Sequence, residues 1–238
     1  MDVITSASPS NRLLDSLPED ERLLFLGDCE TVDLEFGRLV AQPGESMTHA
    51  LFPLDCLISL IATLESGGRL EVAMAGNEGM VGISLMLGAE TSSLQALAQG
   101  AGQVLCIPSS CFQDHLKRSP ELEVVMKRYL NVLMSQISRS AVCAHFHGVE
   151  ARLARWLLMT HDRTRGDEML ITHEFLSGML GVRRAGVTKA AKALQSRGLI
   201  DYQRGRITVL ERPGLDEASC NCYIADREIY ARMREQVA

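Results

Sequence analysis

The 238-residue sequence predicts an α+β fold in which a strand-rich N-terminal half and a helical C-terminal half are joined by one long helix. Three observations support this prediction. Short apolar runs separated by turn residues fill positions 31–107, apolar residues at helical spacing fill 120–147, and further helical segments followed by a hairpin pattern fill 149–210. We therefore divide the chain into residues 12–115, 116–148, 149–212 and 213–238.

The bulk composition describes an ordinary globular protein, with 46% hydrophobic and 23% charged residues. Charges interrupt every apolar stretch before it reaches membrane-spanning length, and the acidic start of the chain does not resemble a secretory signal. We expect a cytoplasmic protein without a membrane partner. The seven scattered cysteines indicate reduced thiols. Cys220 and Cys222 need further ligands to make a metal site, so the sequence predicts neither a metal nor a cofactor.

The N-terminal segment begins with a short helix over residues 11–27 and continues as strands. Turn residues at Pro43-Gly44, Gly67-Gly68 and Gly76-Asn77 separate the apolar runs. Strands at roughly ten-residue spacing predict a compact β-sandwich or roll. The runs that we expect to be strands are 37–40, 57–61, 70–74 and 104–107.

The long helix carries apolar and small residues at a spacing of 4, 3, 4, 3 and 4, which is a heptad seam. We expect this seam to pack against the same helix of a second copy, although a helix buried wholly within one subunit would show a similar pattern. The seam residues are Met126, Leu130, Leu133, Ile137, Ser140 and Ala144.

A helix-turn-helix pattern follows a helix at 149–162 and a short strand at 170–171. Thr172 is a good N-cap for a helix that begins at His173, and Gly181 lies at the turn, where a positive φ is required. We expect the second helix over about 182–195. The residues expected to bury the inner faces of the two helices are Leu176, Ser177, Leu180, Val182, Val187 and Ala190.

The outward face of that second helix is basic. Arg184 and Thr188 are four residues apart near its start, where side chains reach base edges in the major groove. Arg183 and Lys192 are expected to hold phosphates, and Lys189 lies on the same face. The alternative is a basic face exposed only to solvent.

A tight hairpin at 202–210 is expected to form a wing beside this helix, with Arg204 and Arg206 at its tip on the DNA backbone. The charge distribution agrees with a phosphate-binding segment. Residues 1–150 hold nine basic and nineteen acidic residues, whereas residues 151–212 hold twelve basic and six acidic residues, a net charge of +6.

The order of β-roll, long helix and winged helix resembles the Crp/Fnr family of bacterial transcription regulators over residues 12–212. The resemblance implies a cyclic-nucleotide-binding-like β-roll, a dimerisation helix and a winged-helix DNA-binding domain. It implies a homodimeric, sequence-specific regulator of double-stranded DNA, which contacts RNA polymerase if it activates transcription. Arg184 and Lys189 match basic readers of the family, whereas Ala185 replaces an acidic residue, so the familiar target site does not carry over.

The sensor half departs from the family pattern for cyclic AMP. Where the family has a Gly-Glu pair and then an arginine, this sequence has Gly82-Ile83 and Ser92-Ser93, and no arginine occurs between Arg69 and Lys117. A cyclic phosphate needs a cation or a donor nest, so we expect no control by cyclic AMP in the usual mode.

Other cofactors of the family are not expected either. The cysteines do not match the family's N-terminal iron–sulfur cluster, since only Cys29 lies in that region. His145 and His147 could be haem or metal ligands, but as an isolated pair they are interpreted as solvent-facing or hinge residues.

A ligand-sensing module, in which small-molecule binding by the β-roll is the main activity, remains the alternative function. An enzyme is not expected, because no nucleophile elbow, phosphate loop or pair of catalytic carboxylates occurs in the sequence. The extension 213–238 is expected to form an amphipathic helix that packs back on the body.

Overall fold

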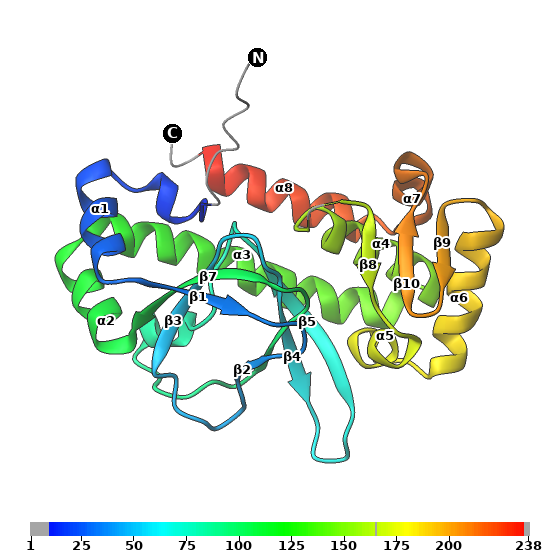
Figure 1. The fold of residues 1–238 in the computed structure, drawn as a ribbon, viewed down its shortest axis with the longest axis horizontal. Coiled ribbons are helices and arrows are strands. Elements are labelled where there is room, and N and C mark those ends of the chain that lie inside the picture. The colour runs from blue at the N-terminus through cyan, green and yellow to red at the C-terminus, as the bar shows by residue number, and fades with distance from the viewer. Residues whose placement is uncertain (1–9, 165, 236–238) are drawn as a thin grey trace.

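The computed structural model describes residues 10–164 and 166–235 of the chain. One long helix, α3 (Pro120–Phe146), runs along both the strand-rich and the helical half of the molecule (Figure 1). Within these described ranges, no helix is both long and apolar enough to cross a membrane.

The N-terminal half is a β-roll of two antiparallel sheets, with strand orders β1–β7–β3 and β2–β6–β4–β5. The strand-rich character predicted from the turn spacing is therefore confirmed. The strands are β1 (Glu30–Leu34), β2 (Leu39–Ala41), β3 (His49–Pro53), β4 (Ile58–Thr63), β5 (Arg69–Ala75), β6 (Gln95–Ala98) and β7 (Gly102–Pro108).

Short helices frame the roll. The helix expected over 11–27 is split, because Leu17 and Pro18 are both extended, with ψ values of 154° and 144°. The segment after the Gly76-Asn77 turn contributes a 3-10 helix before β6. These helices are η1 (Leu14–Ser16), α1 (Glu19–Gly27), η2 (Ile83–Leu87) and, after β7, α2 (Ser109–Arg118).

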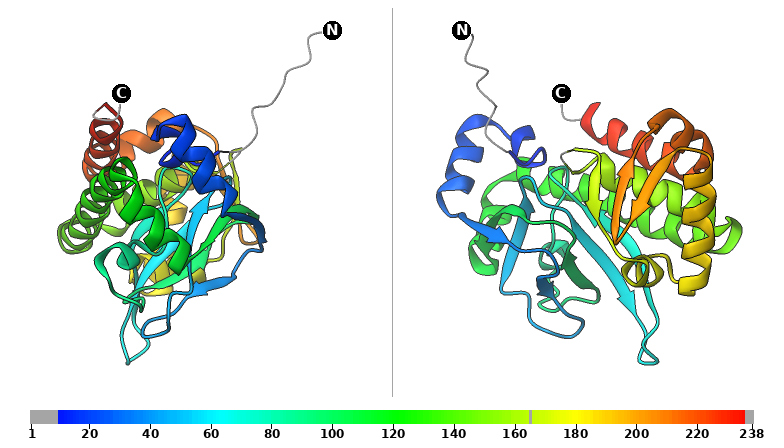
Figure 2. Two further views of the ribbon diagram at one scale, coloured as in Figure 1. Left: turned by 90° about the vertical axis from the view of Figure 1, so that its left-hand side faces the viewer. Right: turned by 45° about the vertical axis from the view of Figure 1, so that its right-hand side comes forward.

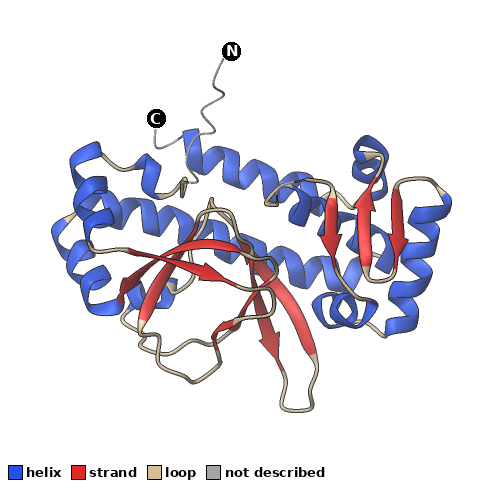
Figure 3. Ribbon diagram, viewed as in Figure 1, coloured by secondary structure: helices blue, strands red, loops and turns tan. Residues whose placement is uncertain are grey.

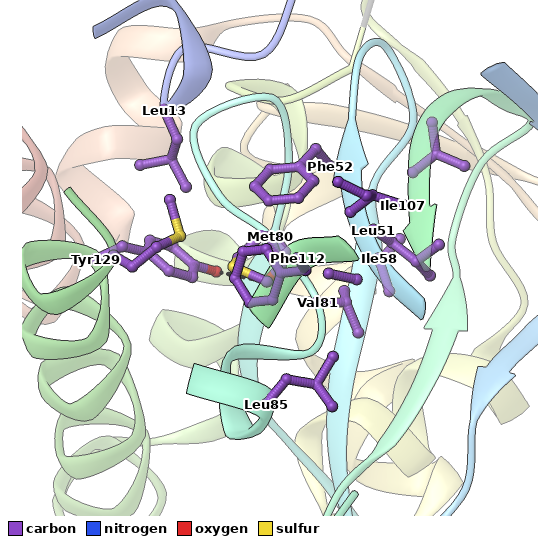
Figure 4. Close-up of a cluster of buried hydrophobic side chains, with 14 of the residues drawn as sticks. Leu13, Leu51, Phe52, Ile58, Met80, Val81, Leu85, Ile107, Phe112 and Tyr129 are labelled. Carbon is purple, nitrogen blue, oxygen red and sulfur yellow. Dashed lines mark hydrogen bonds between the residues drawn. The ribbon is translucent and has the colours of Figure 1, made fainter. Parts of the chain in front are cut away.

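The core of the roll lies between its sheets and α1, α2 and α3 (Figure 4). The Phe25 ring meets the Phe52 and Phe112 rings edge to face, with centroids 5.3 and 6.4 Å apart. Such aromatic pairs add to the free energy gained by burial. Tyr129 of α3 is fully buried, and its hydroxyl donates to the Met80 carbonyl at 2.9 Å. These contacts fix the first half of α3 against the roll.

Strands β4 and β5 are buried on both faces, which explains why their sequence is almost continuously apolar. Ile58 and Leu60 belong to the roll core. Leu57 just before β4, Ile61 and Met74 belong instead to the core of the C-terminal half. The sheet therefore separates two cores and joins the two halves of the molecule.

The C-terminal half is a winged helix-turn-helix followed by two helices (Figure 3). Its three-stranded antiparallel sheet has the order β8–β10–β9. The elements are α4 (Val149–His161), β8 (Glu168–Leu170), α5 (His173–Leu180), α6 (Arg184–Ser196), β9 (Ile200–Gln203), β10 (Arg206–Val209), α7 (Arg212–Ala218) and α8 (Cys222–Glu235).

Contacts between the two halves are close. The Arg163 side chain donates to Glu78 of the roll at 2.5 Å, and both side chains are nearly buried. Helix α5 packs against β5, where a Cβ at Gly178 would lie 3.1 Å from the Arg69 guanidinium. The helix-turn-helix is thus held on the roll as well as on its own core.

Half of the predicted dimer seam of α3 is buried within the protomer. Met126, Leu133 and Ser140 are buried within the protomer, and the Ser140 hydroxyl donates to the Val72 carbonyl at 2.9 Å. These three residues are covered by their own roll, so their assignment to a dimer contact is wrong. The other seam residues, Leu130, Ile137 and Ala144, are half-buried.

A different side of α3 is exposed and partly apolar. Met134 and Val142 are 59% and 49% exposed, and Val124 and Ala141 are exposed as well. Helix geometry places these four residues on one side of α3, at 100° per residue. This side is therefore free to contact a partner.

Helix α8 of the C-terminal extension runs alongside α3 (Figure 2). The Gln136 side chain donates to the Tyr230 hydroxyl at 2.6 Å across this contact. Leu215 of α7 and Tyr223 of α8 are fully buried. The extension therefore packs back on the body as two helices rather than one. Residues 236–238 of the extension lie outside the described residues.

Candidate nucleic-acid interface

The turn between α5 and α6 is built by local rules. The Thr172 hydroxyl caps α5 by accepting from the Phe175 backbone N–H at 3.1 Å. Gly181 ends α5 in the left-handed region, with φ 61° and ψ 39°. Both predictions for this turn are confirmed. Helix α6 begins at Arg184, so Val182 and Arg183 belong to the turn rather than to the helix.

The inner face of this motif is buried as predicted. Val182 is partly buried against the core of the C-terminal half, and Ser177 is half-buried, with its hydroxyl donating to the Glu174 carbonyl. This packing leaves the opposite face of α6 turned away from the body. The buried members of the inner face are Leu176, Leu180, Val187 and Ala190.

The outer face of α6 and the turn before it carry four exposed cations, Arg183, Arg184, Lys189 and Lys192. Among the described residues, none of these four forms an ion pair with an acidic side chain. An unpaired, exposed cation keeps its charge available for a phosphate or a base edge. The structure therefore brings together the basic residues that the sequence indicated on this helix.

Thr188 is placed differently from these cations. It is half-buried, and its hydroxyl lies 3.1 Å from the Arg184 carbonyl and 3.2 Å from His173 Nδ1. The hydroxyl is thus already engaged within the motif.

His173 lies beside the outer face of α6, although it was not predicted as a binding residue. Its ring meets the Tyr202 ring of β9 edge to face at 4.5 Å. Burial, and then the charge of Arg184, lower the pKa of His173, which favours a neutral ring. From the start of α5, His173 therefore contacts both Thr188 of α6 and Tyr202 of the wing. Its place directly after the N-cap is the only signal that the sequence offers.

The wing is a two-residue hairpin between β9 and β10, in which Gln203 pairs with Arg206. Its central residues, Arg204 and Gly205, have φ values of 51° and 78°. Two positive φ values are typical of a type I′ turn, which matches the twist of a hairpin. Arg204 is exposed at this tip, whereas Arg206 forms an exposed ion pair with Glu168 at 2.9 Å.

Known proteins have sequences similar to this chain. A family model described as a Crp-like helix-turn-helix domain matches residues 151–218. The global nitrogen regulator of Nostoc sp. (strain PCC 7120) is 23% identical over 185 residues, which cover 74% of this chain and 82% of that protein. The global nitrogen regulator of Synechococcus elongatus is 23% identical over 193 residues, which cover 77% and 86%.

Solved structures show the same fold. A transcriptional regulator of the Crp/Fnr family from Eubacterium rectale has a TM-score of 0.69 at 18% identity, covering 87% of this chain and 97% of that chain. FixK2 from Bradyrhizobium japonicum has a TM-score of 0.69 at 13% identity, covering 81% and 98%. The arrangement of roll, long helix and winged helix is therefore shared with these proteins.

Proposed function

We propose that the chain is a transcription regulator of the Crp/Fnr family and that it binds a two-fold symmetric site on double-stranded DNA as a homodimer. In this proposal α6 enters the major groove and the wing lies on the DNA backbone. The chain acts by binding and catalyses no reaction. Because its target is DNA, we place it in the cytoplasm with the chromosome.

The observation that carries the proposal is the unpaired basic face of α6. Arg184 lies at the first position of the helix, where base edges are reached, and its planar guanidinium can bond guanine O6 and N7 together. Lys189 follows on the same exposed side of the helix. Arg183, Lys192 and Arg204 are proposed to hold phosphates.

Two of the predicted contacts have a modified role. Since the Thr188 hydroxyl bonds His173 and the Arg184 carbonyl, we propose that Thr188 orients α6 and meets DNA through its methyl group. Arg206 forms an exposed ion pair with Glu168, and we propose that this pair is weak enough for a phosphate to replace Glu168.

The dimer contact is proposed on the exposed side of α3. The residues that would pack against the same helix of a second copy are Val124, Met134, Ala141 and Val142, with half-buried Leu130 and Ile137 at the edge. Burying this apolar side would remove it from water.

The division of the chain follows from these roles. We propose a roll at 12–115, a dimerisation helix at 116–148, a DNA-binding domain at 149–212 and an extension at 213–238. A regulator that activates transcription would also contact RNA polymerase.

The roll is not proposed as a cyclic AMP site of the usual kind. Gly82 and Ile83 start η2, and Ile83 packs against the roll core. The Ser92 hydroxyl donates to the Leu94 carbonyl at 2.6 Å. These side chains offer no cation for a cyclic phosphate. The alternative of a ligand-sensing module as the main activity has no comparable observation in its favour among the described residues.

Selection of random duplex DNA by the full-length protein tests the function. We expect a two-fold symmetric site with half-sites about one helical turn apart. Arg184→Ala should weaken binding to that site by roughly 1–3 kcal/mol, or about fivefold to 150-fold. Arg232→Ala removes the same charge at an exposed position of α8 and serves as the matched control. Enrichment of no sequence, or an equal loss for both variants, would contradict the proposal.

Sedimentation of the protein tests the dimer contact separately. Met134→Glu places a charge on the exposed side of α3 and should shift the protein toward monomer. Leu24→Glu makes a similar change at a position of α1 that is 70% exposed, and it should leave the dimer intact. A dimer that tolerates Met134→Glu would move the contact to another surface.

A further inference from the structure

Three cysteines and one histidine gather where α3 meets the C-terminal extension. Cys143 lies in the last turn of α3 and His147 directly follows that helix. Cys220 and Cys222 lie at the junction of α7 and α8. Their four potential ligand atoms all lie within 4.8 Å of one another, and the three cysteines are buried.

From the sequence alone, Cys220 and Cys222 lacked the further ligands that a metal site needs, and His147 was interpreted as a solvent-facing or hinge residue. The fold brings the four residues together. Cys143 contacts Cys220, which lies 77 positions later in the chain, and His147 contacts Cys222, which lies 75 positions later.

Two distances within this cluster are close to those around one tetrahedral metal ion. Cys143 Sγ lies 3.5 Å from Cys220 Sγ, and Cys222 Sγ lies 3.6 Å from His147 Nδ1. A tetrahedral zinc ion with Zn–S bonds of about 2.3 Å and Zn–N bonds of about 2.0–2.1 Å separates two sulfurs by about 3.8 Å and a sulfur from a nitrogen by about 3.6 Å. Small adjustments of the side chains would complete the geometry.

The donor set favours zinc over other occupants. Three thiolates and one imidazole form a closed set of four ligands, which is typical of structural zinc sites. An iron–sulfur cluster places several iron and sulfide atoms between its cysteines, and these four ligand atoms are too close together for that. A Cys143–Cys220 disulfide would require the sulfurs to approach to about 2.05 Å and would leave Cys222 and His147 without a role.

The surroundings suit the charge of such a site, because three thiolates outweigh one zinc ion and leave a net negative charge. Cys143 lines a small pocket together with the Arg152 and Arg155 side chains, both of which are largely buried. Arg155 also donates to Asp226 of α8 at 2.6 Å. Buried guanidinium groups beside the ligands would offset the remaining negative charge.

We propose that Cys143, His147, Cys220 and Cys222 bind one structural zinc ion that clamps the C-terminal extension to the junction of α3 and α4. His147 and Gly148 are extended and separate these two helices, so the DNA-binding half is attached to α3 at this point. A metal held by residues on both sides would fix the extension to this junction. The clamp revises the expectation of no metal and gives residues 213–238 a structural role that is independent of DNA contacts.

Metal analysis of the full-length protein tests this site without any DNA measurement. Apoprotein prepared with a chelator under reducing conditions is incubated with zinc and desalted, and its metals are measured by mass spectrometry. We expect about one zinc per chain. Cys222→Ser and Cys143→Ser should each lose most of this zinc, whereas Cys111→Ser, which alters a cysteine outside the cluster, should retain it.

Cobalt(II) replaces zinc in a second measurement that needs no substitution and so does not depend on the folding of a variant. Tetrahedral coordination with thiolates should give intense visible d–d bands and sulfur-to-cobalt charge transfer. Zinc retained equally by Cys222→Ser and Cys111→Ser, an octahedral cobalt spectrum, or no bound metal in the wild type would overturn the proposal. A Cys143–Cys220 disulfide in protein isolated without oxidant would also overturn it.

Discussion

Helices α4 and α6 are both thirteen residues long and pack against each other, yet they use their basic residues in opposite ways. In α4, Arg152 and Arg155 are buried, and they donate to the Leu180 carbonyl and to Asp226. In α6, Lys189 and Lys192 are exposed and have no acidic partner among the described residues.

The difference separates two meanings of a basic segment. A buried cation with a partner holds the fold together, because removing it leaves a charge without compensation. An exposed cation without a partner contributes little to stability and remains available to a ligand. The net charge of +6 over residues 151–212 counts both kinds together. Substitutions in the two groups are therefore predicted to affect different properties.

The largest expected effect follows from the loss of a buried, paired cation. Arg163→Met, just beyond α4, should lower the free energy of unfolding by about 3–5 kcal/mol, because Glu78 is left buried without its partner. Urea unfolding measures this change. Arg197→Met breaks an exposed pair with Glu150 and should change stability by less than about 1 kcal/mol. Equal losses for the two variants would remove the distinction.

A buried acid beside α4 extends the comparison to pH. Burial is the main cause that raises the pKa of Glu71 from 4.5 to about 7, although Ser59, Trp156, Arg155 and Arg163 lower it. An acid with a raised pKa contributes stability that is fully present below its unfolded pKa, and this contribution is lost as the pH rises through 7.

Glu71→Gln should therefore be more stable than the wild type by about 3 kcal/mol at a pH of about 8.5 and similar to it at a pH of about 4.5. Thermal unfolding across this pH range checks the change. Glu65→Gln, in the exposed β4–β5 turn, should show no such dependence. A constant difference between Glu71→Gln and the wild type at every pH would contradict the assignment.

The helix-turn-helix could be predicted in detail because its determinants are local. Thr172 caps the helix that follows it, and Gly181 adopts a positive φ that the turn requires. The basic residues then follow from helix periodicity alone. The alternation of turns likewise predicted the strand-rich half, because each strand is bounded by its own turn residues.

Features that depend on packing between distant segments could not be predicted in this way. The heptad spacing of α3 shows that one side is apolar, but not whether the roll or a second copy covers it. Met126 and Leu133 are covered by the roll, while exposed Met134 lies on another side. In the same way, no sequence spacing links Cys143 to Cys220.

Within the exposed group, base readers and phosphate contacts should differ. Arg184→Ala should relax specificity at one base pair of the selected site, whereas Lys192→Ala should weaken binding to all sequences about equally. Lys192→Ala should also reduce the salt slope by about 1. Binding to single-base variants of the site at several salt concentrations separates the two. The assignment fails if Lys192→Ala changes the preferred base.

The smallest effect is expected at the wing, where Arg204 combines an exposed charge with a strained backbone. Its φ of 51° is uncommon for a residue other than glycine, and asparagine adopts this conformation more easily in a type I′ turn. Arg204→Asn should therefore raise the free energy of unfolding by about 0.5 kcal/mol while it lowers the salt slope of DNA binding by about 1. Arg206→Asn, in the strand beside it, should lower the slope without a gain in stability, because Arg206 has no positive φ to relieve. A stability gain for both variants would show that charge repulsion at the tip, rather than backbone strain, is the cause.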